Sequence, residues 1–151
     1  MSPENRRIIL LVEDNPDDEV LTLRALKESN VLNQIVVVRD GAEALDYLFG
    51  TGQYKERDMN LMPQLILLDI NIPKLNGMEV LQQIRGDKRT KYLPVVMLTS
   101  SREEQDLIAS YELGVNSYIR KPVNFDQFAD AIRYLGLYWL VLNELPGTPR
   151  G

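Results

Sequence analysis

Short apolar runs recur along the chain, and longer segments with helical periodicity separate them. Each run spans five to seven residues and is bounded by charged or turn-forming residues, which is typical of a strand. Aliphatic runs without alternation indicate strands that are buried on both faces, as in a parallel sheet. The predicted strands are Arg7–Val12, Gln34–Val38, Gln64–Leu68, Leu93–Thr99 and Asn116–Arg120.

The segments between and after these strands place apolar residues at helical spacing and begin with residues that cap helices. Asn15 precedes Pro16 as a candidate N-cap, and Ser101 with Glu104 matches the capping-box pattern. Residues 50–63 are polar and aperiodic, so we expect a long surface loop there. The predicted helices are Asn15–Glu28, Gly41–Phe49, Asn76–Gly86, Ser100–Gly114 and one that begins near Asn124.

Five strands that alternate with five helices predict an α/β fold with a parallel sheet and right-handed crossovers. The length of 151 residues suits one domain, which we expect over residues 1–145, including an apolar extension of the last helix. Residues 146–151 are expected to form a flexible tail. In such folds ligands bind beyond the carboxyl ends of the strands, so the residues at those ends are the candidates for function.

Charged and hydroxyl side chains stand where four of the predicted strands end. Glu13 and Asp14 follow the first strand, Asp69 follows the third, Thr99 ends the fourth and Lys121 follows the fifth. Convergence of these ends would bring together three carboxylates, one hydroxyl and one ammonium group. The carboxylates then need a compensating cation or a raised pKa, because two of them ~4 Å apart repel by ~4 kcal/mol at an effective dielectric constant of ~20.

A hard divalent cation with oxygen ligands suits this set of side chains. Mg²⁺ typically binds one or two carboxylates together with water and a phosphate oxygen. Asp69 can then act as a nucleophile toward phosphorus, because carboxylates form aspartyl phosphates. Lys121 and Thr99 would bind and neutralise the phosphoryl oxygens. The strand ends therefore predict phosphoryl transfer to an aspartate.

The amino-acid composition excludes several kinds of active site and several classes of protein. The chain has no histidine and no cysteine, which excludes Ser-His-Asp triads, histidine zinc sites and cysteine nucleophiles on this chain. A net charge of −5 and a pI near 4.8 argue against direct nucleic-acid binding. No apolar run approaches the ~20 residues that span a membrane, and the N-terminus lacks a signal-peptide pattern. We expect a cytoplasmic protein without membrane contact.

Four motifs stand out in order along the chain: LLVEDNPDD, LILLDINIPKLNG, VVMLTSS and SYIRKPVNFDQF. Together they resemble the receiver domain of two-component response regulators over nearly the whole chain. The resemblance implies a flavodoxin-like, doubly wound sheet of five parallel strands in the order 2-1-3-4-5. It also implies that Asp69 accepts a phosphoryl group from the phosphohistidine of a partner histidine kinase.

The resemblance implies a role for each residue at the strand ends. Asp14 and Asp69 would bind Mg²⁺, with Glu13 acting largely through water and Asn71 through its backbone carbonyl. Lys121 would pair with the phosphoryl group, and its bond to the following proline is expected to be cis.

Thr99 and Tyr118 match the family's switch pair, in which the hydroxyl moves to the phosphate and the aromatic ring turns inward. The plain alternatives are a helix cap for Thr99 and a half-buried strand tyrosine for Tyr118. Asp17 and Asp18 are interpreted as first-turn acids that the helix dipole favours, and not as metal ligands.

The C-terminal segment is apolar on nearly all sides, more than one buried face requires. We interpret it as an interface for a second copy or a partner, with extra core packing as the alternative. This segment and the long loop resemble regulators that accompany bacterial phytochrome kinases, which implies a phytochrome-type sensor histidine kinase as partner. The apolar surface itself indicates a homodimer through the C-terminal helix region. The candidate interface residues are Tyr134, Tyr138, Trp139, Val141 and Leu142.

We therefore expect a single-domain response regulator that signals by homodimerisation or phosphorelay, not an enzyme, with slow self-dephosphorylation. Three alternatives stay open. A phosphohydrolase of the haloacid dehalogenase type has an acid two residues after its nucleophile, where this chain has Asn71. A flavodoxin-like flavin carrier needs a hydroxyl- and glycine-rich phosphate loop after the first strand, where this chain has EDNPDD. A receiver that has lost its chemistry would act as a scaffold.

Overall fold

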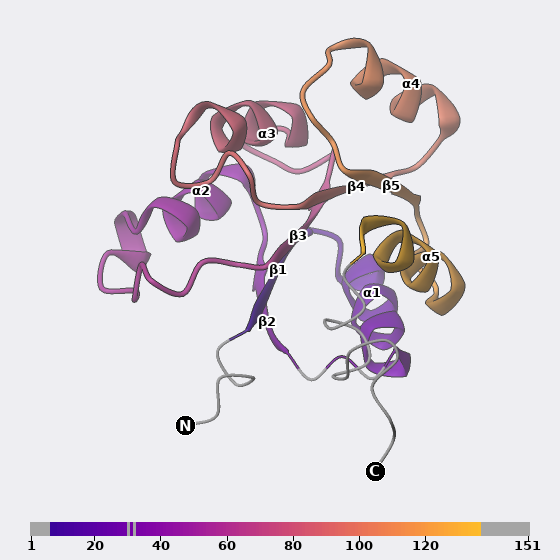
Figure 1. The fold of residues 1–151 in the computed structure, drawn as a ribbon, viewed down its shortest axis with the longest axis horizontal. Helices are drawn as coiled ribbons and strands as arrows, with labels where there is room; N and C mark the ends of the chain where they lie inside the picture. The colour runs from indigo at the N-terminus through magenta and orange to yellow at the C-terminus, as the bar shows by residue number, and fades with distance from the viewer. Residues whose placement is uncertain (1–6, 30, 32, 137–151) are drawn as a thin grey trace.

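The computed structural model describes residues 7–29, 31 and 33–136. A five-stranded parallel sheet has the order β2-β1-β3-β4-β5 and helices on both faces (Figure 1), so the predicted fold class and strand order are confirmed. The strands are β1 (Ile8–Val12), β2 (Gln34–Val38), β3 (Leu65–Asp69), β4 (Val95–Thr99) and β5 (Ser117–Arg120). The helices are α1 (Pro16–Glu28), α2 (Gly41–Phe49), α3 (Gly77–Gly86), α4 (Arg102–Ser110) and α5 (Phe125–Leu135), with a 3-10 turn, η2 (Gly52–Tyr54).

Each face of the sheet has its own hydrophobic core. In β1, Ile9 and Leu11 belong to one core and Leu10 and Val12 to the other, as the alternation of side chains along a strand requires. Helices α1 and α5 cover the first core, and α2 and α3 lie on the opposite side of the sheet (Figure 1). Every residue of β1, β3 and β4 is buried, which explains why these strands are continuous apolar runs in the sequence.

A polar side chain caps the N-terminus of each of the helices α1 to α5. These caps accept a hydrogen bond from a first-turn backbone N–H and are Asn15, Asp40, Asn76, Ser101 and Asn124. At α3, Asn76 and Glu79 form a complete capping box. The capping box predicted for α4 is only half formed. Glu104 N–H donates to the Ser101 hydroxyl at 3.1 Å, but the Glu104 carboxylate accepts its hydrogen bonds from other groups.

Helix α4 ends at Ser110, four residues before the predicted stop at Gly114. Glu112 and Gly114 have positive φ angles of 52° and 78°, which a right-handed helix does not contain. Arg85 holds this path, because its guanidinium donates to the Gly114 carbonyl at 2.7 Å and to the Leu93 carbonyl at 2.8 Å. Tertiary contacts therefore end the helix before its sequence pattern does.

The predicted long loop after α2 is organised around Arg57. Arg57 Nε donates to the Tyr47 carbonyl at 2.6 Å, and Nη1 donates to the Leu61 carbonyl at 2.9 Å. The guanidinium carbon lies 4.3 Å from the centre of the Tyr47 ring, which makes a cation–π contact. Tyr54 of η2 packs edge-on against the same ring. Arg57 thus holds the loop after α2 against the end of that helix through hydrogen bonds and a cation–π contact.

Of the residues predicted to form an interface, only Tyr134 is among the described residues, and it is 79% exposed. Tyr138, Trp139, Val141 and Leu142 lie outside the described residues, as does the predicted tail over residues 146–151. In the described part of the chain, no helix has both the length and the apolar character that crossing a membrane requires.

Candidate functional site

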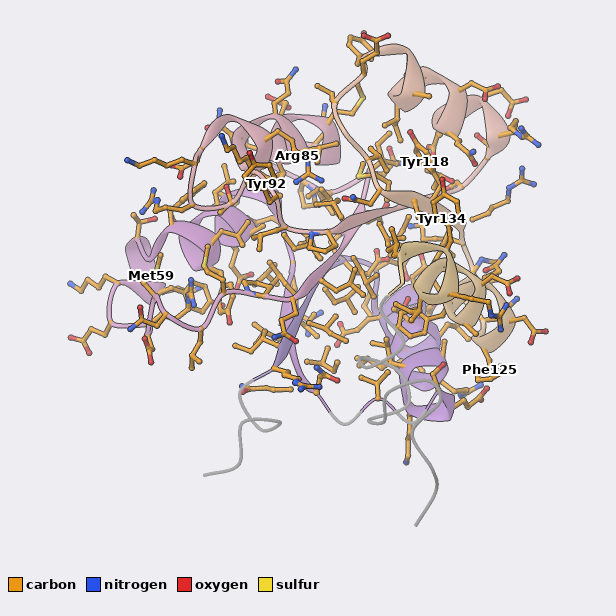
Figure 2. The ribbon with its side chains drawn as sticks, viewed as in Figure 1. Met59, Arg85, Tyr92, Tyr118, Phe125 and Tyr134 are labelled. Carbon is orange, nitrogen blue, oxygen red and sulfur yellow. The ribbon has the colours of Figure 1, made fainter. Side chains whose placement is uncertain are left out.

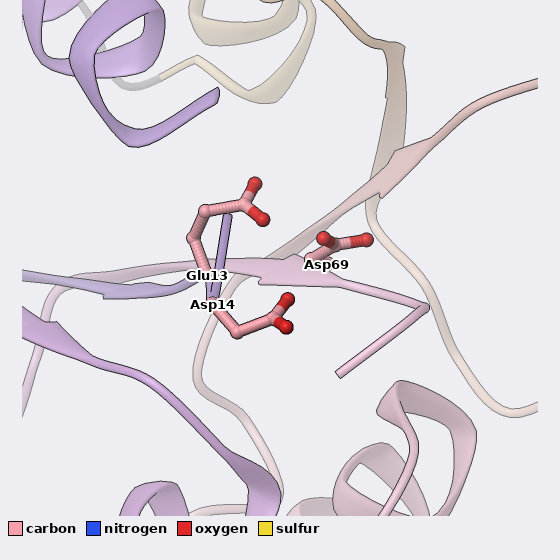
Figure 3. Close-up of side chains that lie close together, drawn as sticks. All are labelled: Glu13, Asp14 and Asp69. Atoms are coloured by element: carbon pink, nitrogen blue, oxygen red, sulfur yellow. The ribbon is translucent and has the colours of Figure 1, made fainter. Parts of the chain in front are cut away.

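Three acidic side chains meet where the carboxyl ends of the strands form one edge of the sheet. Glu13 and Asp14 directly follow β1, and Asp69 is the last residue of the neighbouring strand β3. One carboxylate oxygen from each residue lies within 4.8 Å of the others, and Figure 3 shows the three groups close together. The parallel register brings them there, since Val12 pairs with Leu68. We call these three residues the acidic edge.

Burial sets the electrostatics of the acidic edge. Glu13 and Asp69 are almost fully buried, whereas Asp14 is exposed. Loss of water around Glu13, with the neighbouring Asp69 as a further cause, raises the pKa of Glu13 to about 8. Glu13 Oε1 has no hydrogen-bond partner among the described residues. Three hard oxygen donors, one of them unsatisfied, fit a divalent cation such as Mg²⁺.

Lys121 supplies positive charge beside the acidic edge. Its Nζ donates to Asp69 Oδ2 at 2.8 Å and lies 3.8 Å from Glu13 Oε1. Burial alone lowers the pKa of Lys121, but the hydrogen bond from Lys121 to Asp69 and the charges of Asp69 and Glu13 raise it above its ordinary value. Lys121 is therefore held as an ammonium ion, and its bond to Pro122 is cis, as the resemblance implies.

Asp18 also lies at this site, although its place in the first turn of a helix predicts no role beyond an interaction with the helix dipole. Its Oδ2 accepts a hydrogen bond from Lys121 Nζ at 3.2 Å. The sequence holds one signal for this: Asp18 lies in the first turn of a helix that begins two residues after Asp14, at the same edge of the sheet. The partner itself is 103 residues away, so the pairing depends on the fold.

Thr99 ends β4, the strand on the other side of Asp69, and Asp69 pairs with the adjacent Leu98. Thr99 is fully buried, and its hydroxyl has no hydrogen-bond partner among the described residues. The helix-cap alternative is wrong, because Ser101 caps α4. The hydroxyl is therefore buried without a hydrogen bond among the described residues, at the end of the strand beside Asp69.

Tyr118 lies in β5, further from the carboxyl edge than Thr99, because Thr99 pairs with Arg120 and Tyr118 with Met97. Tyr118 is half-buried, and burial raises its pKa. It lines a hollow of about 310 Å³ together with Tyr134, and Figure 2 shows the two rings near each other between α4 and α5. The structure thus places Tyr118 outside the acidic edge, at a surface that leads away from it.

Asn71 lies two residues after Asp69, and its backbone and its side chain make hydrogen bonds to different residues. Its backbone N–H donates to Asp69 Oδ1 at 3.0 Å, while its side-chain Nδ2 donates to Glu104 Oε2 at 2.8 Å. The side-chain nitrogen of Asn71 is thus engaged by Glu104. A metal-ligand role for its backbone carbonyl, which the resemblance implies, stays a prediction. Glu104 is a second residue near the site that the sequence did not indicate.

Gly77 allows α3 to start against the end of β3. A Cβ atom at this position would lie 2.6 Å from the Asp69 carbonyl oxygen and 2.7 Å from the Ile70 Cα. Gly77 N–H donates to the Ile70 carbonyl at 2.9 Å, so the close approach is fixed. The glycine is needed for this backbone approach, which positions the strand end that carries Asp69.

Comparison with known proteins gives the same family as the motifs. The family model of the response regulator receiver domain matches residues 9–133. The response regulator Rcp1 of Synechocystis sp. is 40% identical, over 98% of this chain and 100% of Rcp1. The match therefore includes the acidic edge, Thr99 and Lys121.

Solved structures of high similarity share the fold. The bacteriophytochrome response regulator AtBRR has a TM-score of 0.85 and 56% identity, covering 94% of this chain and 100% of that chain. The Mn²⁺-bound form of Rcp1 has a TM-score of 0.72 and 40% identity, covering 93% and 99% of the two chains. The phosphorylated cyanobacterial phytochrome response regulator RcpA has a TM-score of 0.72 and 42% identity, also covering 93% and 99%. On these similarities, the chain belongs to the response regulator receiver family, close to phytochrome response regulators.

Proposed function

We propose that this protein is a phosphorylation switch in which Asp69 accepts a phosphoryl group from the phosphohistidine of a sensor histidine kinase. The observation that carries the proposal is the position of Asp69: a buried carboxylate, 2.8 Å from the Lys121 ammonium and grouped with two further carboxylates within 4.8 Å. A solitary structural aspartate would need neither the neighbouring acids nor a buried lysine.

The reaction uses the residues at the acidic edge. An Asp69 carboxylate oxygen forms a bond to phosphorus as the P–N bond to the donor histidine breaks, and the electron pair of that bond returns to the imidazole. Lys121 stabilises the negative charge on the transferring oxygens. The Thr99 hydroxyl, which has no hydrogen-bond partner in the described part of the chain, can donate to one of them. These are the roles expected from the strand ends.

Mg²⁺ is the expected cofactor. Asp14, Asp69 and the Asn71 backbone carbonyl would hold it, with Glu13 acting largely through water. When bound, it neutralises charge on the carboxylates and on the phosphoryl oxygens. The Mn²⁺-bound form of Rcp1 and the phosphorylated form of RcpA support a metal and a phosphoryl group in relatives of this chain.

The output is a change in protein contacts. We propose that the phosphoryl group draws in the Thr99 hydroxyl and that Tyr118 follows, which alters the surface of α4, β5 and α5. The partners are a phytochrome-type histidine kinase and a second copy of this chain through the C-terminal segment, with a phosphorelay partner as the alternative. The protein acts as a signalling protein with slow self-dephosphorylation. A cytoplasmic location stays a prediction.

Intact-mass analysis after incubation with Mg²⁺ and acetyl phosphate tests the proposal. Wild type should gain one phosphoryl group, with a requirement for Mg²⁺, and Asp69→Asn should gain none. Incubation with a phosphorylated phytochrome-type histidine kinase extends the test to the proposed donor. An adduct of equal yield in Asp69→Asn would place the phosphoacceptor at another residue. No adduct from either donor, together with no Mg²⁺ binding, would leave a scaffold as the better account.

A further inference from the structure

Glu104, in the first turn of α4, joins the two loops that flank Asp69. Its Oε1 accepts a hydrogen bond from the Ser100 backbone N–H at 2.6 Å. Its Oε2 accepts one from Asn71 Nδ2 at 2.8 Å. One carboxylate therefore connects the loop after β3 with the loop after β4, and we call this arrangement the Glu104 bridge.

The Glu104 bridge is not an ordinary helix cap. At α3, Glu79 shows the ordinary arrangement, in which the carboxylate accepts from the N–H of the N-cap residue Asn76 at 3.2 Å. At α4 the N-cap is Ser101, yet the Glu104 carboxylate accepts from Ser100 instead and reaches across to Asn71. Glu79 and Glu104 thus occupy the same helix position. Only the Glu104 carboxylate turns away from its N-cap residue, toward the loops that flank Asp69.

Asn71 connects the Glu104 bridge to Asp69, the proposed phosphoacceptor. The backbone N–H of Asn71 donates to Asp69 Oδ1 at 3.0 Å, while its side chain donates to Glu104. On the other side, Ser100 directly follows Thr99, whose strand lies beside the strand of Asp69. Two short connections therefore link Asp69 to Glu104.

The charge of Glu104 has no compensating cation. Its carboxylate receives hydrogen bonds from neutral N–H groups, and the ion pairs among the described residues do not include it. A phosphoryl group on Asp69 brings a charge of about −1.5 to −2 to the same region. Like charges repel, so the negative Glu104 carboxylate disfavours a phosphoryl group on Asp69.

We propose that Glu104 is a positioning residue that holds the loops after β3 and β4 in their unphosphorylated arrangement and, through its charge, slows phosphorylation of Asp69. This inference rests on the proposed function of Asp69. Phosphorylation then requires the bridge to open, which couples the chemistry at Asp69 to the start of α4.

The test compares Glu104→Gln and Glu104→Ala with Glu103→Gln, in the full chain. Glu103 lies in the same turn, is exposed and carries the same charge, so its replacement is a matched control. The measurement is the initial rate of phosphorylation by acetyl phosphate at saturating Mg²⁺, followed by intact mass. Melting temperatures of all variants establish that they are folded before rates are compared.

Both Glu104 variants should be phosphorylated about three- to tenfold faster than wild type, and Glu103→Gln should stay within about twofold. Glutamine has the size of glutamate and can still accept from Ser100 N–H, and its NH₂ group can donate to Asn71 Oδ1 once the Asn71 amide turns over. A purely structural role therefore predicts that Glu104→Gln behaves like wild type. That result, or an equal acceleration in Glu103→Gln, would overturn the proposal while leaving Asp69 as the acceptor. No adduct in wild type or any variant would instead overturn the proposed function, and the role of Glu104 with it.

Discussion

The acidic edge and the loop around Arg57 both gather polar groups about a charge, but they leave those groups in different states. The Arg57 guanidinium donates to the carbonyls of Tyr47 and Leu61 at 2.6 and 2.9 Å. At the acidic edge and in the neighbouring strand β4, Glu13 Oε1 and the Thr99 hydroxyl are buried without a hydrogen-bond partner among the described residues. A buried polar atom without a partner costs about 1–3 kcal/mol. In the folded protein the polar groups of the Arg57 loop are therefore hydrogen-bonded, whereas Glu13 Oε1 and the Thr99 hydroxyl are not, and we expect a ligand to bind them.

After removal of the acceptor Asp69 itself, replacement of Lys121 should have the largest effect on phosphorylation. Lys121→Met removes the ammonium that lies 2.8 Å from Asp69, and we expect phosphorylation by acetyl phosphate to slow by about 100-fold. Lys88→Met is the control, because Lys88 is an exposed lysine in the loop after α3, away from the acidic edge. Rates from intact mass decide the matter, and a Lys121→Met rate close to wild type would contradict the proposed role.

The raised pKa of Glu13 predicts how stability depends on pH in metal-free protein. The pKa is about 8 in the folded state and near 4.5 in the unfolded chain, so the folded state keeps a proton that the unfolded state loses between these values. Stability from this group is fully present below about pH 4.5 and is lost as the pH rises through about 8. Melting temperature in EDTA should therefore fall over this range.

Glu13→Gln is the control for that pH dependence, because glutamine cannot ionise. The variant should lack the Glu13 contribution, and the difference between the two melting curves should grow with pH. The chain has no histidine, so few other side chains titrate in this range. Parallel curves for wild type and Glu13→Gln would show that Glu13 is not protonated in the folded state.

At the Arg57 loop we expect a loss of stability without a loss of chemistry. Arg57→Ala leaves the carbonyls of Tyr47 and Leu61 without their donor, and the free energy of unfolding should fall by about 1–2 kcal/mol. Lys55→Ala removes a cation from the same loop, at an exposed position, and should change stability little. Denaturant unfolding measures both. A large change in phosphorylation rate for Arg57→Ala would undo the contrast between the two regions.

Asp18 should have the smallest effect. Asp18→Asn removes one of the negative partners of Lys121 and leaves the ammonium freer to meet a phosphoryl oxygen, so we expect phosphorylation about twofold faster. Asp17→Asn, in the same helical turn and exposed, is the matched control. A slower rate in Asp18→Asn would mean that Asp18 positions Lys121 productively instead of competing for it.

Much of the fold could be predicted from the sequence because β1, β3 and β4 are buried throughout and appear as unbroken apolar runs. The acidic edge could be predicted because parallel strands place their carboxyl ends together, which brings Glu13 and Asp69 to one place from positions far apart in the chain. Local pattern and topology were enough for these residues.

Asp18, Glu104 and Arg57 could not be assigned in the same way. From the sequence, the helix dipole accounts for Asp18 and a capping box with Ser101 accounts for Glu104, whereas their further partners come from distant segments. Arg57 lies in an aperiodic segment, where no repeat indicates which face is buried. For such residues the deciding contact is tertiary, so the side-chain direction has to be seen in the structure.

The most direct test of whether the acidic edge binds a cation is calorimetric titration of Mg²⁺ into metal-free protein at pH 7. The titration is repeated in two buffers of different ionisation enthalpy, which reveals how many protons binding releases. With a pKa of about 8, Glu13 is largely protonated at that pH, so Mg²⁺ binding should release protons from wild type. Proton release should be smaller in Glu13→Gln, and Mg²⁺ binding should be lost in Asp14→Asn combined with Asp69→Asn. Binding that the double substitution leaves unchanged, or no binding to wild type, would contradict the account.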